Sequence, residues 1–198
     1  MEKVKKIDKR SLRTRSLIKK AVIVLLKKKR PNEIAVTEVT KIALISRNSF
    51  YTHYNSILDV LDDIFNDVLD SFDLVLSKYD YSEFEKNPYP CLKEISVPLI
   101  ANSAFSEFVI FSKSSNSFVQ GIIDALTEKF YNKYLQNRGT SNENIPYMVN
   151  FLVAGSINFV YKWFVDGKVV PYDMVLKDIS NLITEGIKMI RNIKNEKA

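Results

Sequence analysis

The stretch ALISRNSFYTHYNS, residues 43–56, gathers side chains that can form hydrogen bonds to a nucleic acid. The guanidinium of Arg47 can donate two parallel hydrogen bonds to a guanine edge, and the amide of Asn48 can pair with an adenine. Hydroxyl and imidazole groups that suit phosphates or base edges follow directly: Ser49, Tyr51, Thr52 and His53. The chain has no other histidine. This combination on so short a stretch favours a base-reading element over an ordinary surface helix.

The basic residues of the chain are concentrated in its first quarter. Residues 1–54 contain 15 Lys and Arg against 4 Asp and Glu, or +11, whereas the remainder carries −5 within a net charge of +6. This asymmetry predicts a polyanionic partner for the N-terminal part, with nucleic acid favoured over an anionic membrane surface. The plain alternative is that the lysines only keep one helix face soluble.

Composition predicts an all-α protein in a reducing compartment. Five Gly and six Pro among 198 residues are few for a turn-rich β protein, and 46% hydrophobic residues suffice for a core. The single Cys91 excludes an internal disulfide and a thiolate metal cluster. The N-terminus lacks the apolar segment of a signal peptide, and no run reaches the roughly 18 uninterrupted apolar residues of a membrane span. We therefore expect a cytoplasmic protein without metal or cofactor.

The same inventory disfavours an enzyme. One histidine, one cysteine, no Gly-rich phosphate loop and no HExxH or CxxC spacing leave little for metal or nucleophilic catalysis. The carboxylates stand at positions expected on solvated helix faces. We expect no enzymatic activity.

Apolar periodicity predicts four helices that position the 43–56 stretch. They span residues 11–29, 37–43, 47–53 and 57–78, and their expected N-caps are Ser11, Thr37, Ser46 and Ser56. The first helix is basic opposite its apolar stripe, and the fourth has aspartates in its N-terminal half, where the helix dipole favours them. The second and third helices form a helix-turn-helix pattern, whose second helix enters the major groove of DNA.

The segment RTRSLIKKAVIVLLKKKRPNEIAVTEVTKIALISRNSFYTHYNSILDVLDDIF resembles the DNA-binding domain of TetR/AcrR-type transcriptional regulators. The likeness covers about residues 10–70 and rests on the Arg-Thr-Arg start, the threonine at 37 and the Phe-Tyr-x-His-Tyr element at 50–54. It implies phosphate contacts from the threonine, from Tyr51 and from His53, and base contacts from the start of the 47–53 helix. The expected DNA-binding residues are Thr37, Ser46, Arg47, Asn48, Ser49, Tyr51, Thr52 and His53.

Two positions depart from the family pattern. Leu44 stands at the turn position that usually holds Gly, where a left-handed backbone costs a leucine roughly 1 to 2 kcal/mol. Either the leucine adopts that conformation or the turn is built differently. Ile57 stands where the family often has a phosphate-binding Lys at the start of the fourth helix. We expect Asn55 or Ser56, with the amides of the helix start, to substitute for it, or the extra lysines of the leading arm to compensate.

Further helices are predicted over residues 90–103, 117–137, 144–165 and 171–192. The segment YKWFVDGKVVPYDMVLKDISNLITEGI, residues 161–187, resembles a branch of the family that includes the dihydroxyacetone-kinase-operon type of regulator. The expected fold is all-α with about nine helices: a three-helix DNA-binding domain over residues 1–55 and an effector-binding and dimerisation bundle over residues 56–198. The last two helices are apolar enough to pair across a two-fold axis as a homodimer, although they can also complete an intrachain core.

The resemblance implies a repressor that a small effector releases from a palindromic operator. The effector would bind inside the helical bundle, and the fourth helix would transmit the change to the two reading heads. Aromatic residues expected to line the pocket are Phe108, Phe111, Phe130, Tyr134, Phe159 and Trp163. Two other interpretations remain open: a co-regulator of the same fold that acts through a protein partner, and a basic amphipathic protein of membrane surfaces.

Overall fold

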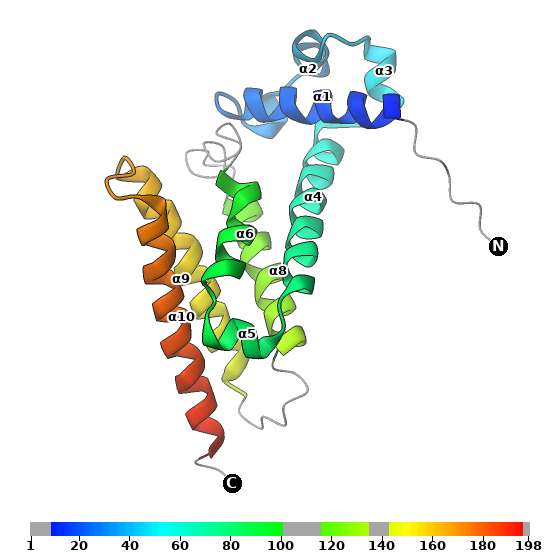
Figure 1. Ribbon diagram of the computed structural model, residues 1–198. Coiled ribbons are helices and arrows are strands. Elements are labelled where there is room, and N and C mark those ends of the chain that lie inside the picture. The colour runs from blue at the N-terminus through cyan, green and yellow to red at the C-terminus, as the bar shows by residue number, and fades with distance from the viewer. Residues whose placement is uncertain (1–8, 101–115, 135–142, 196–198) are drawn as a thin grey trace, which may run out of the picture. The chain divides into compact units, whose positions relative to one another are not determined.

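The computed structural model describes residues 9–100, 116–134 and 143–195. These residues contain nine α-helices, one short 3₁₀-helix and no β-strand (Figure 1), which confirms the all-α class. The helices are α1 (Lys9–Leu26), α2 (Val36–Ala43), α3 (Arg47–Tyr51), α4 (Ile57–Lys78), α5 (Tyr81–Lys86), α6 (Tyr89–Ile100), α8 (Asn116–Tyr134), α9 (Ile145–Val165) and α10 (Tyr172–Asn195), with the 3₁₀-helix η1 at Pro31–Glu33.

The described chain divides into two compact units, and the division falls inside α4, between Asp67 and Val68. The first unit therefore holds α1, α2, α3 and the N-terminal half of α4. The second unit holds the remainder of α4 with α5, α6, α9, α10 and nearly all of α8. The functional domains expected at 1–55 and 56–198 stay a prediction.

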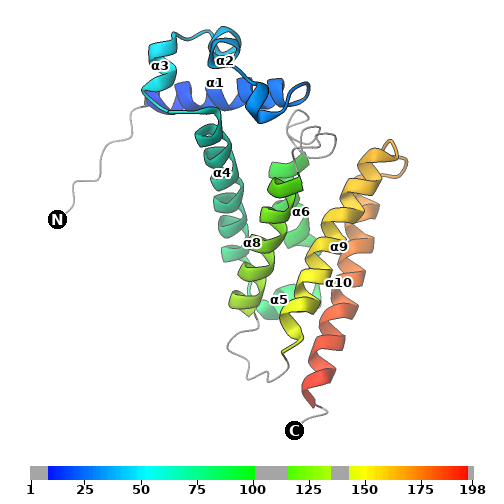
Figure 2. The ribbon, with the colours of Figure 1, turned by 180° about the vertical axis from the view of Figure 1, so that it is seen from behind.

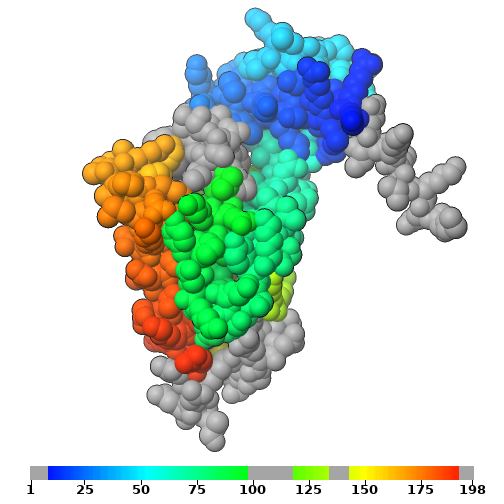
Figure 3. All heavy atoms as spheres, in the orientation of Figure 1, coloured from blue at the N-terminus to red at the C-terminus, as the bar shows by residue number. Residues whose placement is uncertain are grey.

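The first unit is organised around α1. Both views show α2 and α3 lying against the same side of α1 (Figures 1 and 2), and their side chains pack into one body, blue to cyan in Figure 3. The apolar stripe of α1 supplies the centre, since Ile18 and Val22 are fully buried. Val39 of α2 and Phe50 of α3 are also fully buried. Short helices bury little surface alone, so this shared core holds α2 and α3 in place.

Two of the four expected N-caps are confirmed. The hydroxyl oxygen of Ser46 accepts from the amide of Ser49 at 3.0 Å, and that of Ser56 accepts from the amide of Asp59 at 3.1 Å. The prediction for Ser11 was wrong, because α1 already includes Lys9.

The prediction for Thr37 as an N-cap was also wrong. Ala35 occupies the cap position of α2, and the carboxylate of Glu38 accepts its amide hydrogen at 3.1 Å. The glutamate three residues after the cap thus satisfies the helix start without a capping hydroxyl. Thr37 lies inside the first turn of α2 and is exposed.

Two helices end earlier than their sequence pattern indicates. α1 ends at Leu26, and the amides of Lys28 and Lys29 turn back onto the carbonyl of Leu25 at 3.0 Å. α3 ends at Tyr51, so His53 lies in the turn that follows, with its amide donating to the carbonyl of Phe50 at 2.9 Å.

In the second unit, α9 and α10 run side by side in opposite directions (Figure 2). α5 was not predicted, although its signal was readable: Asp80 accepts the amide hydrogen of Glu83 at 2.9 Å in a capping box. The other helices begin within one residue of their expected starts, and the ends expected at 103 and 137 lie outside the described residues. Cys91 of α6 is 1% exposed, and burial raises the pKa of its thiol to about 12.

α9 carries much of the apolar surface that the second unit leaves uncovered. Tyr147 is 74% exposed and Phe151 is 76% exposed. Within the part of the chain that the structure describes, α9 is also the one helix long and apolar enough to cross a membrane, judged by length and composition only. α10, in orange to red at the surface in Figure 3, adds exposed Leu182 and Met189, and several large exposed apolar side chains are typical of an interaction surface.

Candidate nucleic-acid interface

α3 has one buried and one exposed side. Phe50 is fully buried and packs edge-on against the ring of Tyr51, with 5.5 Å between the ring centroids. This anchor and the Ser46 cap fix the rotation of the five-residue helix. Arg47 and Asn48 are exposed as a result, and Tyr51 is 49% exposed. The structure therefore brings the expected base-reading side chains to one accessible surface.

The remaining predicted DNA-binding residues differ in whether their polar groups already form hydrogen bonds within the chain. Ser46 accepts a hydrogen bond in its cap role, so its hydroxyl proton stays available for a phosphate. Thr52 donates its one hydroxyl proton to the carbonyl of Asn48 at 2.9 Å, so a donation to phosphate requires that bond to break. Ser49 and His53 are partly buried, and Thr37 is exposed on the first turn of α2.

The turn between α2 and α3 uses a leucine in the left-handed conformation. Leu44 has φ 53° and ψ 46° and is 90% exposed, while the amide of Ile45 donates to the carbonyl of Thr40 at 3.1 Å. The turn thus has the geometry that favours glycine, and the leucine accepts the strain.

Replacing Leu44 with glycine is expected to stabilise the protein by about 1 kcal/mol, because the left-handed strain disappears and an exposed side chain contributes little packing. Thermal unfolding should show a rise in Tm of about 2 to 4 °C. Leu44→Ala is the matched control, since it removes the same apolar side chain but keeps Cβ in a left-handed backbone. An equal gain for both variants would contradict the strain explanation.

At the start of α4, the groups of Asn55 and Ser56 that were expected to contact phosphate form hydrogen bonds within the chain. The carboxylate of Asp59 accepts the backbone amide hydrogen of Asn55 at 2.9 Å and the hydroxyl hydrogen of Ser56 at 2.6 Å. Ile57 is 8% exposed, so it contributes to the core. An aspartate occupies the helix start and would repel a phosphate there. That these groups replace the family's lysine stays a prediction, which the neighbouring carboxylate disfavours.

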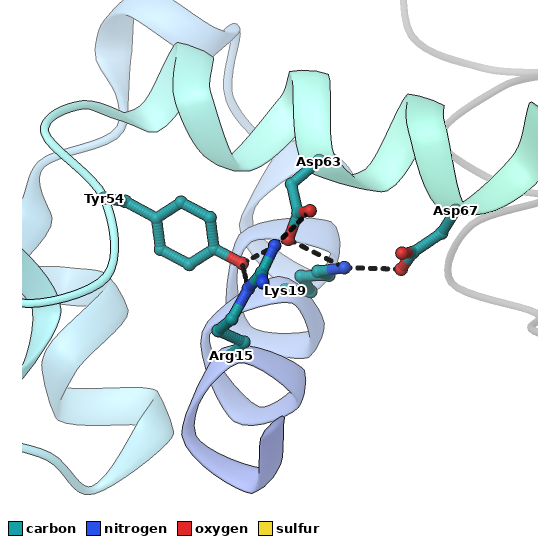
Figure 4. A network of polar contacts seen from close by, with 5 residues as sticks. All are labelled: Arg15, Lys19, Tyr54, Asp63 and Asp67. Atoms are coloured by element: carbon teal, nitrogen blue, oxygen red, sulfur yellow. Dashed lines mark hydrogen bonds and ion pairs between the residues drawn. The ribbon is translucent and has the colours of Figure 1, made fainter. Parts of the chain in front are cut away.

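A network of side chains connects α1, the chain after α3, and α4 (Figure 4). The carboxylate of Asp63 pairs with Arg15, lies 2.8 Å from Nζ of Lys19, and accepts the hydroxyl hydrogen of Tyr54. Lys19 also pairs with Asp67 at 2.5 Å. Tyr54, expected from its spacing to be core, is 5% exposed, and the guanidinium of Arg15 lies 5.7 Å from the centre of its ring. Sequence periodicity located this tyrosine but not the role of its hydroxyl.

The network sets the protonation of its members. Burial opposes ionisation of Asp63, but hydrogen bonds from Lys19 and Tyr54 and the positive charges of Lys19 and Arg15 outweigh it, so the pKa of Asp63 lies below its ordinary value. Burial and the bond to Asp63 raise the pKa of Tyr54, so its hydroxyl keeps its proton. At neutral pH the site is one carboxylate held by two cations and one phenol.

Asp63 should therefore contribute stability that depends on pH. A carboxyl whose folded pKa is lowered stabilises the fold fully above its unfolded pKa, about 3.9, and loses that contribution as the pH falls through the folded value. We expect the Tm difference between the wild type and Asp63→Asn to be constant from pH 7 to 5 and to shrink below about pH 4. Thermal unfolding across that range measures it. A difference that stays constant to pH 2.5 would contradict an ionised Asp63 as its source.

The expected effector-pocket residues are placed only in part. Phe108 and Phe111 lie outside the described residues, as does the side chain of Tyr134. Phe130 of α8 packs against Phe84 of α5, with 5.1 Å between ring centroids.

The other two pocket candidates lie on α9. Phe159 is 37% exposed. The ring of Trp163 packs against that of Tyr172, with 4.9 Å between the ring centroids, and its indole nitrogen donates to the carbonyl of Val170 at 2.8 Å. These contacts of Trp163 connect α9 to the start of α10 and give the side chain a structural role. The effector pocket therefore stays a prediction.

The fold and this interface define a two-unit helical protein with a helix-turn-helix reading head. A family model for TetR-type proteins, described as the C-terminal region of transcriptional regulators, matches residues 86–185, half of the chain. A TetR-family transcriptional regulator from Streptomyces coelicolor has the same fold in its crystal structure: the TM-score is 0.63 at 13% identity, over 92% of this chain and 86% of that one. A search of curated proteins found no match. The chain belongs to the TetR family of transcriptional regulators.

Proposed function

We propose that this regulator is a repressor that binds a palindromic operator as a homodimer and is released by a small effector. The observation that carries the DNA-binding part is the two-sided α3, whose Phe50 is buried while Arg47 and Asn48 face solvent. Arginine and asparagine are the residues that best discriminate guanine and adenine in the major groove. A five-residue helix fixed by its neighbours is well suited to present them.

The other interface residues supply phosphate contacts around α3. Thr37 stands at the exposed start of α2, and Ser46 keeps a hydroxyl proton at the start of α3. Tyr51 and His53 extend the contacts beyond the C-terminal end of α3, while Ser49 reaches a base or phosphate. Thr52 is the weakest of the expected ligands because its hydroxyl already donates to Asn48.

The dimer uses the exposed stripe of α9 and α10. Residues 147, 151 and 155 follow one another at four-residue spacing on exposed α9, and Gly155 has nothing within 4 Å of where a Cβ would lie. Leu182 and Met189 extend the stripe on α10. A bulky apolar face with a small residue at its centre lets the same face of a second chain approach closely.

The effector site lies within residues 56–198, the expected effector-binding region, and acts without a metal or cofactor. The aromatic residues expected to line it are Phe108, Phe111, Phe130, Tyr134, Phe159 and Trp163. As a DNA-binding regulator the protein works in the cytoplasm and has no enzymatic activity of its own.

Fluorescence anisotropy tests the proposal. The probe is the duplex that the wild-type protein enriches from a random-sequence DNA pool, and a scrambled duplex of equal composition is the control. We expect tighter binding to the enriched duplex, saturation at two chains per duplex, an inverted repeat in its sequence, and a steep loss of affinity with salt. Equal, weak binding to both duplexes would instead support a co-regulator that acts through a protein partner, and binding to anionic vesicles alone would support a membrane-surface protein.

A further inference from the structure

Asp63 connects three parts of the reading head through one side chain (Figure 4). Its partners are Arg15 and Lys19 of α1 and Tyr54, which directly follows the turn after α3. The carboxylate and the ammonium are largely closed to solvent, since 17% of the Asp63 side chain and 15% of the Lys19 side chain are exposed, whereas 41% of the Arg15 side chain is exposed. A carboxylate with three donors in such a site holds its neighbours at fixed positions.

This arrangement controls the direction of α3. α3 has only five residues, so its own backbone hydrogen bonds hold it weakly. Its C-terminal side is fixed by Tyr54, whose amide donates to the carbonyl of Phe50 at 3.0 Å and whose hydroxyl donates to Asp63. Without the carboxylate, the phenol loses its acceptor in the core, and the position of α3 relative to α1 is less well defined.

The same carboxylate also neutralises two cations of the most basic part of the chain. Residues 1–54 carry a net charge of +11. Arg15 and Lys19 are engaged by Asp63 and therefore do not extend toward a phosphate backbone. Cations that are not engaged in this way attract any DNA sequence equally, because phosphate contacts carry no base information.

We propose that Asp63 is a specificity-determining residue for DNA binding, because it positions α3 and withholds Arg15 and Lys19 from non-specific phosphate contacts. The inference rests on the proposed DNA-binding function. It predicts opposite changes in specific and non-specific affinity when the carboxylate is removed, which general loss of structure would not produce.

The test compares Asp63→Asn with Asp67→Asn on the enriched and the scrambled duplex. Both changes remove one negative charge from the same helix, one turn apart. The Asp67 side chain is 61% exposed, and its ion-pair partner among the described residues is Lys19. In Asp67→Asn, Lys19 keeps its ion pair with Asp63. Asp63→Asn is expected to weaken binding to the enriched duplex roughly tenfold and to strengthen binding to the scrambled duplex. On the scrambled duplex the slope of log K against log salt should steepen by about one, because Arg15 loses its carboxylate partner while Lys19 keeps its ion pair with Asp67. Asp67→Asn should leave both slopes near the wild-type value.

Tyr54→Phe provides a second test that does not change the net charge. It removes the hydroxyl and leaves both ion pairs of Asp63 in place. Specific affinity should fall by several-fold, while affinity for the scrambled duplex and its salt slope stay unchanged. Circular dichroism at the assay temperature establishes that each variant is folded, and if Asp63→Asn unfolds, this variant decides the positioning role.

The failures of the inference and of the proposed function are distinguishable. A wild-type protein that enriches no sequence from the pool overturns the proposed function, and the role of Asp63 with it. A wild type with clear specificity, together with an Asp63→Asn variant whose two affinities change in the same direction, overturns the role of Asp63 alone. Tyr54→Phe with unchanged specific affinity overturns the positioning part.

Discussion

Replacing Arg47 with alanine is expected to weaken binding to the enriched duplex by about 1 to 3 kcal/mol, or roughly 5- to 150-fold, and to relax base preference at one position of each half-site. The guanidinium is exposed at the start of α3, and no hydrogen bond or ion pair of its side chain is recorded among the described residues. Its removal should therefore leave the Tm within about 1 °C of the wild type, so that the loss is a loss of recognition.

Arg47→Lys is the matched variant for this prediction. Lysine keeps the positive charge but lacks the planar fork that binds both acceptors of a guanine. Specific affinity should fall nearly as far as for alanine, whereas affinity for the scrambled duplex should stay at the wild-type level. Competition assays with single-base variants of the duplex locate the affected position. If alanine weakened both duplexes equally and lysine restored both, Arg47 would be a phosphate contact instead of a base contact.

Replacing Phe151 with glutamate should have a larger effect, because it acts on both reading heads together. Phe151 is 76% exposed in the middle of the apolar stripe of α9. In the proposed dimer its ring is buried against a second chain, where an unpaired carboxylate is strongly unfavourable. We expect the variant to be monomeric by sedimentation at micromolar concentration. Its affinity for the full palindrome should fall 100-fold or more. In a dimer, binding of one DNA-binding domain holds the other close to its half-site, which raises the overall affinity by about 10²- to 10⁴-fold, and a monomer loses this gain.

Leu74→Glu is the control for the Phe151 variant. Leu74 is 65% exposed on α4 of the same unit, so the substitution adds the same charge at another exposed apolar position. This variant should remain dimeric and bind the palindrome normally. A dimeric Phe151→Glu protein would place the dimer interface elsewhere, whereas dissociation of both variants would point to a general loss of stability in the second unit.

Local sequence signals predicted most helices and the accessible side of α3. Apolar spacing identified Phe50 and Tyr54 as core, and the hydroxyl of Ser46 identified the start of α3. Helix ends were less well predicted, because backbone turns such as those that bond to the carbonyls of Leu25 and Phe50 depend on the packing around them. Thr37 shows the same limit, since α2 begins one residue earlier and the glutamate after Thr37 accepts the amide hydrogen of Ala35, the residue at the cap position.

The polar network of the reading head could not be predicted from local sequence. Arg15 and Asp63 are 48 positions apart, and their meeting depends on how α1 crosses α4. The aspartates of α4 suggested only a favourable interaction with the helix dipole. Only the three-dimensional arrangement shows that one of them binds two cations and a phenol, while Asp59 accepts hydrogen bonds from the amide of Asn55 and the hydroxyl of Ser56.

The buried thiol of Cys91 has a consequence for how signals can reach this protein. With a pKa raised to about 12, the sulfur stays protonated at cellular pH, and a protonated, enclosed thiol reacts slowly with peroxides, disulfides and alkylating agents. Oxidative stress therefore has no reactive cysteine to act on in this chain. The same inertness is useful at the bench: a fluorophore or spin label attached through a cysteine introduced at an exposed position will mark that position alone.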